Sequence, residues 1–200
     1  MTSANEKTKF EKARPEKTQS EKTKFGKTSV ACGVLVDALK AKFGDDIARL
    51  EVHERKAGVA GETQSYDLWV EAADRAAFRP LLEELFAYDF VNFHVISGDD
   101  VGDDVALNYH FSLFQRTRKG RVGVSVTVRV PKSDLSMPSI HDLLPGSEYS
   151  EREIREMFGV DFVGLPNKAL VFLPEDWSEE VKPWRRDSTG PSPEIVRELR

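Results

Sequence analysis

A run of alternating valines places the strongest limit on how this chain can fold. In Arg121–Val130 a valine stands at every second position, with small or polar residues between. Side chains alternate between the two faces of a strand, so the run predicts a strand with one core-facing valine face. Its other face would meet water or a partner. A β-rich run, Val105–Thr117, comes before it, and Arg118–Gly120 predicts a hairpin turn between them.

Helical spacing appears twice upstream of these strands. Ala31–Phe43 places its apolar residues on one helical face. Asp74 is a good N-cap for a second helix that runs through Tyr88. Further strands are predicted at Ile47–His53, Tyr66–Glu71 and Phe90–Ser97, with loops or turns at Gly58–Gly61 and Gly98–Asp104. This order predicts an α+β fold, with a mixed or antiparallel sheet and helices on one face.

The two ends of the chain differ from its middle. Residues 1–29 repeat a Glu-Lys pair every five residues, a period that fits neither helix nor strand, and they predict a disordered tail. Residues 30–160 predict the folded domain. Residues 161–200 contain five prolines and predict an extended interaction segment.

The composition narrows the function classes. A total of 29 Lys and Arg against 34 Asp and Glu gives a net charge of −5, which argues against a protein devoted to nucleic acid. No apolar stretch approaches the roughly 20 residues that span a bilayer, and we expect no secretory signal. The single cysteine, Cys32, cannot form an internal disulfide, and the scattered histidines predict no metal site. We interpret Cys32 as a small buried hydrophobe.

The segment after these strands carries the most specific pattern. Ser150 and Glu153 have the spacing of a capping box that begins a helix, and Gly159 suits the left-handed residue that ends it. Glu151 can pair with Arg155 four residues on, which places Glu151 at the exposed start of the helix. The apolar residues expected to face inward are Ile154, Met157 and Phe158.

The motifs follow one another in a fixed order. Pro138-Ser139 is followed by a Pro-Gly-small-x-aromatic step that ends at Tyr149, and then by Glu-Arg-Glu-x-x-acidic-Met-Phe-Gly. This order resembles the 30 kDa subunit family of respiratory complex I (NADH:quinone oxidoreductase) and of related membrane-bound hydrogenases. A weaker resemblance extends over residues 35–187. Downstream, Leu165-Pro166 replaces the family's His-Pro pair, whereas Asp176-Trp177 resembles one of its closing elements.

The resemblance implies a scaffold subunit without a catalytic residue, metal or cofactor of its own. Flavin, iron–sulfur clusters and quinone, or a Ni–Fe centre, are then expected in partner subunits. The expected partners are the large quinone-site or hydrogenase large subunit and neighbouring iron–sulfur subunits, at the cytoplasmic face of the cell membrane. The complex would pass electrons from NADH to quinone and translocate protons. Alternatives are the same subunit of an energy-converting hydrogenase or formate hydrogenlyase, and a free-standing protein-binding adaptor.

The predicted partner interface comprises Glu151, Arg152, Glu153, Met157, Phe158, Asp176, Trp177, Trp184, Arg185 and Arg186. We expect an exposed apolar patch centred on Met157, Phe158, Trp177 and Trp184. Glu151 and Glu153 could alternatively be catalytic carboxylates of a soluble enzyme, although interface ion pairs and a helix cap are the favoured interpretation. Arg185 and Arg186 could alternatively bind anionic lipid or phosphate.

Overall fold

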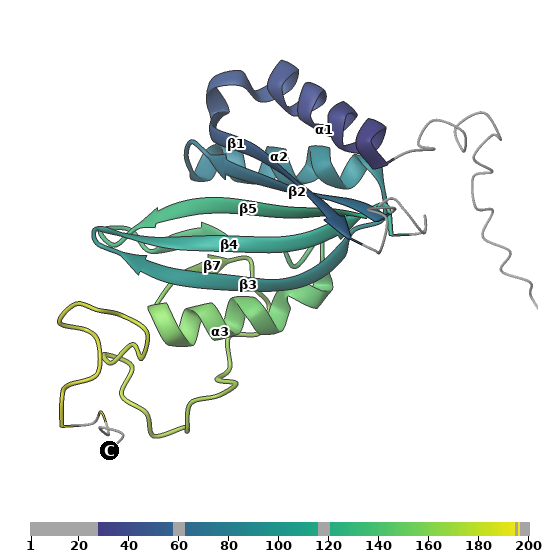
Figure 1. The fold of residues 1–200 in the computed structure, drawn as a ribbon. Helices are drawn as coiled ribbons and strands as arrows, with labels where there is room; N and C mark the ends of the chain where they lie inside the picture. Colours follow the sequence, from purple (N-terminus) through teal and green to yellow (C-terminus); the bar gives the residue numbers. More distant parts are fainter. Residues whose placement is uncertain (1–27, 58–62, 116–120, 195, 197–200) are drawn as a thin grey trace, which may run out of the picture.

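A mixed five-stranded sheet forms the centre of the protein (Figure 1). The computed structural model describes residues 28–57, 63–115, 121–194 and 196. The strands are β1 (Ile47–Ala57), β2 (Thr63–Ala72), β3 (Asn92–Val101), β4 (Asp104–Leu113) and β5 (Val122–Pro131). Their order is β1-β2-β5-β4-β3, with β2 and β5 parallel and the other neighbours antiparallel. The predicted tail up to residue 27 and the predicted turns at Gly58–Gly61 and Arg118–Gly120 lie outside the described residues.

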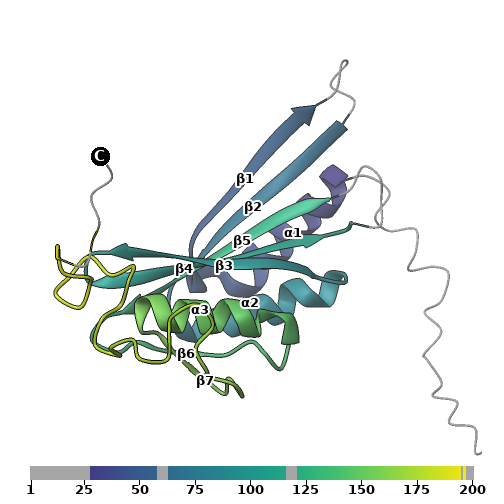
Figure 2. The ribbon, with the colours of Figure 1, turned by 90° about the horizontal axis from the view of Figure 1, so that it is seen from below.

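Three helices cover one face of this sheet, which confirms the predicted fold class (Figure 2). They are α1 (Thr28–Phe43), α2 (Arg75–Tyr88) and α3 (Glu148–Phe158). α1 and α2 pack on β2 and β5, whereas α3 packs on β3. Short 3-10 turns, η2 (Gly44–Asp46) and η3 (Pro145–Ser147), follow α1 and precede α3. Among the described residues, no helix is long and apolar enough to cross a membrane.

The valine face of β5 lies at the centre of the core. All five valines of β5 are buried, whereas Arg129 between them is exposed. Across the antiparallel pair, Tyr109 stands opposite Val126 and Phe111 opposite Val124. Fully burying one valine is favourable by about 1.5–3 kcal/mol, so this face strongly determines which side of the strand turns inward. The prediction drawn from the alternating valines is confirmed.

Helices α1 and α2 pack on the β2–β5 part of this core through their apolar residues. The carboxylate of Asp74 accepts a hydrogen bond of 2.8 Å from the backbone N–H of Ala77, which confirms the N-cap of α2. The buried residues of α2 are Ala77, Phe78, Leu81, Leu82 and Leu85. On α1 the buried set is Cys32, Leu35, Leu39 and Phe43. Burial also raises the pKa of the Cys32 thiol, as expected for a cysteine that packs like a small hydrophobe.

The open face of the sheet carries polar side chains around the exposed ring of Trp69, and many of these polar groups bond to one another. His110 of β4 bridges Ser97 on one neighbouring strand and Ser125 on the other, at 2.9 Å each. Arg129 pairs with Glu71 of β2 at 2.8 Å. Hydrogen bonds between neighbouring strands therefore satisfy several of the side chains that alternate with the core residues.

The aspartate-rich segment Gly98–Asp104 is mostly strand, not the turn that was predicted. β3 continues to Val101 and β4 begins at Asp104, so only Gly102 and Asp103 form the turn. Local propensity favours a turn here, but pairing with β4 extends the strand.

Residues beyond 160 also contribute to the folded domain. β6 (Ser136–Pro138) pairs in parallel with β7 (Asp161–Val163) to form a second, two-stranded sheet. The described residues from 164 onward contain no helix or strand, which agrees with the extended C-terminal segment expected from the prolines. This C-terminal segment runs past α3 and returns to the end of β3 (Figure 1).

Candidate functional site

α3 carries the residues of the most specific sequence pattern, but it begins earlier than expected. The helix starts at Glu148, directly after η3, so Ser150 already lies inside it and forms no capping box with Glu153. The predicted N-cap is therefore wrong. Gly159 ends the helix at φ 81°, in the left-handed region that favours glycine, as predicted.

Glu151 is fully buried, which corrects its expected exposure at the helix start. Its carboxylate accepts hydrogen bonds from the Ser139 hydroxyl at 2.6 Å, the Ile140 backbone N–H at 2.8 Å and the Ser147 hydroxyl at 3.1 Å. The predicted pair with Arg155 does not form. Burial raises the pKa of Glu151, while these donors oppose that rise. Glu151 therefore fastens the segment before α3 to the helix.

The arginines of α3 bind backbone carbonyls of the C-terminal segment. Arg152 is buried and donates from Nε to the Ala169 carbonyl at 2.8 Å and from Nη2 to the Leu170 carbonyl at 3.0 Å. Arg155 donates to the Lys168 carbonyl at 3.1 Å. Truncating Arg152 would remove the side-chain donors of these two carbonyls, so we expect it to loosen the contact between α3 and the C-terminal segment.

Glu156 binds the same segment from the same helix face, and sequence reasoning gave it no role. Its buried carboxylate accepts from the backbone N–H groups of Val171, Phe172 (3.0 Å) and Leu173 (3.3 Å). We call residues 168–173 the strap. Glu156 stands four residues after the motif arginine, so their shared helix face was the available signal. Cations and an anion of α3 thus satisfy the polar backbone of one strap.

The apolar end of α3 is internal as well. Phe158 is buried against β3, where a Cβ added at Gly98 would lie 2.4 Å from its ring. Its ring meets that of Trp184 edge-on at 5.5 Å, and Met157 is also buried. The expected exposed patch on Met157 and Phe158 is therefore wrong, because both pack within the chain. Glu153 stays half-buried, and burial raises its pKa.

A second anchor holds the chain further along, at residues 185–187, which we call the latch. The buried Asp100 of β3 accepts from the Arg186 backbone N–H at 2.7 Å, and Lys132 pairs with it at 2.6 Å. Burial opposes ionisation of Asp100, but these partners outweigh it and hold its pKa below the usual range. The buried charge is thereby compensated.

The two latch arginines are placed differently. Arg185 is buried and bonds Asp187 at 2.6 Å and the Phe158 carbonyl at 3.1 Å. The Arg186 side chain is exposed, although its guanidinium donates to Asp99 at 3.0 Å. Both arginines therefore have partners within the chain.

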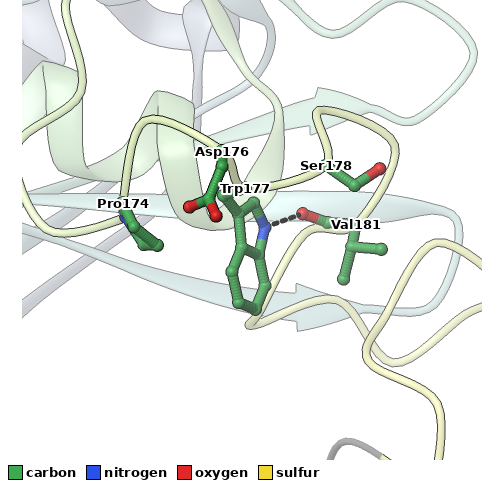
Figure 3. A pocket seen from close by; sticks show the side chains of 5 residues that line it. All are labelled: Pro174, Asp176, Trp177, Ser178 and Val181. Carbon is green, nitrogen blue, oxygen red and sulfur yellow. Dashed lines mark hydrogen bonds between the residues drawn. The ribbon is translucent and has the colours of Figure 1, made fainter.

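Between the strap and the latch, residues 174–181 form a segment that we call the loop. Pro174, Asp176, Trp177, Ser178 and Val181 line a pocket of about 240 Å³ there (Figure 3). The Trp177 indole N–H donates to the Val181 carbonyl at 2.9 Å. In the described part of the chain, no group of three or more His, Cys, Asp or Glu side chains is arranged to hold a metal ion.

The family model for the 30 kDa subunit of respiratory-chain NADH dehydrogenase matches residues 68–194. The match includes α3, strap, loop and latch. The chain belongs to this family. The resemblance drawn from the α3 motif is confirmed.

Curated members of the family come from several kinds of complex. The membrane-bound hydrogenase subunit beta of Pyrococcus furiosus is 32% identical over 131 residues, 65% of this chain and 75% of that protein. Formate hydrogenlyase subunit 5 of Escherichia coli is 35% identical over 89 residues, 43% of this chain and 16% of that protein. The C/D subunit of NADH-quinone oxidoreductase from Pseudomonas fluorescens is 34% identical over 86 residues, 43% of this chain and 14% of that protein. This chain therefore spans only a small part of the last two.

A solved structure supports the fold. It is a chain of the membrane-bound sulfane sulfur reductase, described as an archaeal respiratory membrane complex. The TM-score is 0.58 at 21% identity, and the match covers 78% of this chain and 84% of that chain. At this identity the likeness bears on the fold alone.

Proposed function

We propose that this 30 kDa-family chain is a non-catalytic subunit in the peripheral part of a membrane-bound, complex I-like oxidoreductase. One observation carries the proposal: three charged residues of the family motif bind groups of the chain itself. Glu151, Arg152 and Glu156 are buried, and their partners lie within the chain. These residues hold the surface segments of the chain in place, as expected of a scaffold subunit. The names of the relatives supply the kind of assembly.

The surface that would meet a partner lies on the C-terminal segment. Phe172 in the strap is 61% exposed, and Trp184 beside the latch is 45% exposed. Large exposed apolar side chains are one feature of protein interfaces. Of the predicted interface residues, we keep as contacts Glu153, Asp176, Trp177, Trp184 and Arg186. We assign to internal support Glu151, Arg152, Met157, Phe158 and Arg185.

Electron transfer would take place in the partner subunits. These would be the large quinone-site or hydrogenase large subunit and neighbouring iron–sulfur subunits, on the cytoplasmic face of the membrane. They would carry flavin, iron–sulfur clusters and quinone, or a Ni–Fe centre. The identity of the neighbours decides the electron donor and acceptor.

Affinity purification of the tagged chain from native membranes in mild detergent tests the proposal. Mass spectrometry would identify the chains that co-purify. Flavin-carrying NADH subunits would assign the complex to the NADH-linked type, and a nickel-binding large subunit without them to the hydrogenase type. Recovery of the chain alone, from the soluble fraction, would refute the proposal and favour the adaptor.

A matched pair of variants tests the proposed surface. Phe172→Ala removes an exposed ring from the strap, and Phe90→Ala removes a 74% exposed ring from the connection between α2 and β3. We expect only Phe172→Ala to lower the recovery of neighbours. Equal recovery with both variants would show that the strap ring is not part of the interface.

A further inference from the structure

The loop is held at both ends, by the strap and by the latch, and its own hydrogen bonds do not reach the rest of the domain in the described part of the chain. The strap before it is held by Arg152 and Glu156, and the latch after it by Asp100. Within the described residues, the hydrogen bonds of the loop stay inside it, among them one from the Trp177 backbone N–H to the Pro174 carbonyl at 3.0 Å. A loop fixed at both ends offers its outer surface with little further ordering, which favours binding.

The pocket in this loop combines one aromatic wall with one carboxylate. Pro174, Trp177 and Val181 provide apolar walls, and the Asp176 carboxylate lies beside the indole (Figure 3). The bond from the indole N–H to Val181 fixes the orientation of the ring. Asp176 forms no ion pair with any described residue, so its charge is available to a partner.

The charge around the pocket is strongly negative. Residues 169–181 contain four carboxylates and no lysine or arginine. Lysines flank this stretch on both sides: Lys168 pairs with Asp161, and the half-buried Lys182 interacts electrostatically with Glu179. Arg185 and Arg186 are held in the latch. The four carboxylates outnumber the adjacent lysines, so the loop keeps a net negative charge that complements a cationic partner.

We infer that this pocket binds the side chain of an arginine presented by a neighbouring subunit. A guanidinium can lie flat on the indole face while its paired N–H groups donate to a carboxylate. A lysine ammonium lacks the plane that matches both groups. The inference rests on the proposed function, which supplies the neighbouring subunit, and it specifies the chemistry of the contact.

Titration of the full chain followed by NMR tests the pocket directly. The signal of the Trp177 indole N–H, assigned with Trp177→Phe, should shift on addition of an acetylated tetra-arginine amide. Tetracitrulline, which has the same shape without the charge, should leave it unmoved, and tetralysine should bind more weakly. Equal shifts with citrulline, or equal affinity for lysine, would overturn the inference.

Two variants with the same change of charge separate the pocket from diffuse acidity. Asp176→Asn should weaken arginine binding about threefold, as for an exposed ion pair, whereas Glu175→Gln outside the pocket should leave it nearly unchanged. Equal weakening by both would overturn the inference. A chain without residues 1–27 should keep the free indole signal. Residues 1–27 contain eight basic and four acidic residues, so a changed signal would identify them as the occupant and overturn the inference.

The intact complex separates failure of this inference from failure of the proposed function. If the wild-type chain recovers neighbours from membranes, Asp176→Asn should lose them at lower salt than Glu175→Gln does. Equal salt resistance would overturn the arginine contact and leave the proposed function standing. If the wild-type chain recovers no neighbour, the proposed function fails, and the binding of tetra-arginine alone decides the chemistry of the pocket.

Discussion

Glu156→Gln should loosen the strap without unfolding the domain. The carboxylate of Glu156 accepts from three consecutive backbone N–H groups, those of residues 171–173. Glutamine keeps the shape, but it offers a single amide oxygen and turns an NH₂ group toward the remaining donors. The variant thus leaves at least one backbone N–H without an acceptor and removes the charge from the others.

The size of the effect follows from these three bonds. Hydrogen bonds to charged groups contribute about 1.5–3 kcal/mol each, and neutral ones about 1 kcal/mol. A loss of about 1 kcal/mol per bond gives about 3 kcal/mol for local opening. Since about 1.4 kcal/mol corresponds to a factor of ten, opening of the strap should become on the order of 100-fold more frequent.

Amide hydrogen exchange measures this opening residue by residue. The amides of Val171, Phe172 and Leu173 should exchange on the order of 100-fold faster in Glu156→Gln, while those of β4 and β5 should keep their rates. Glu153→Gln is the control, because it makes the same change on the same helix at a half-buried carboxylate. Unchanged exchange rates of the strap amides in Glu156→Gln, or the same acceleration in Glu153→Gln, would refute the role of Glu156 in holding the strap.

Three further predictions concern the core and the buried carboxylates. Gly98→Ala should cost about 1–3 kcal/mol in urea unfolding, because the new Cβ meets Phe158, and Phe158→Leu should recover part of the loss. Asp100 has a lowered pKa in the folded state, so its stabilising effect is present at neutral pH and is lost in acid. The stability advantage of wild type over Asp100→Asn should therefore shrink as pH falls through about 4, and a constant advantage would contradict it. Glu151 has a raised pKa, so wild type should lose stability relative to Glu151→Gln as pH rises above about 4.5, and a difference independent of pH would contradict the burial argument.

Periodicity was enough to predict the sheet and most helix faces. The valines of β5 repeat every second residue, as in a strand, and the apolar residues of α2 repeat with the period of a helix. Each period therefore predicts which side of the element faces the core. On α1 the buried face includes Cys32, as expected, but Val34, another apolar residue of the segment Ala31–Phe43, is 38% exposed. The stripe was therefore predicted correctly in kind but rotated slightly on the helix.

The candidate site was harder to predict, because its partners are backbone groups. At i,i+4 spacing, charges on α3 suggested an exposed ion pair between Glu151 and Arg155. Nothing in the sequence says that the strap crosses this helix face, or that its N–H and C=O groups need partners. Only the fold brings Glu156 to three strap amides. The capping box failed for a related reason, since η3 leads into α3 before Ser150 is reached.

The bond between Asp100 and Arg186 also imposes an order of events during synthesis. The two residues stand 86 positions apart, so β3 and β4 leave the ribosome long before the latch. Until the latch arrives, the Asp100 carboxylate has Lys132 as its described ionic partner, and the end of β3 stays wet. Closing the latch therefore covers this carboxylate: a chain that stops before residue 185 retains a hydrated charge at the end of β3. A protease added during folding would therefore find the end of β3 accessible before the latch closes and covered afterwards.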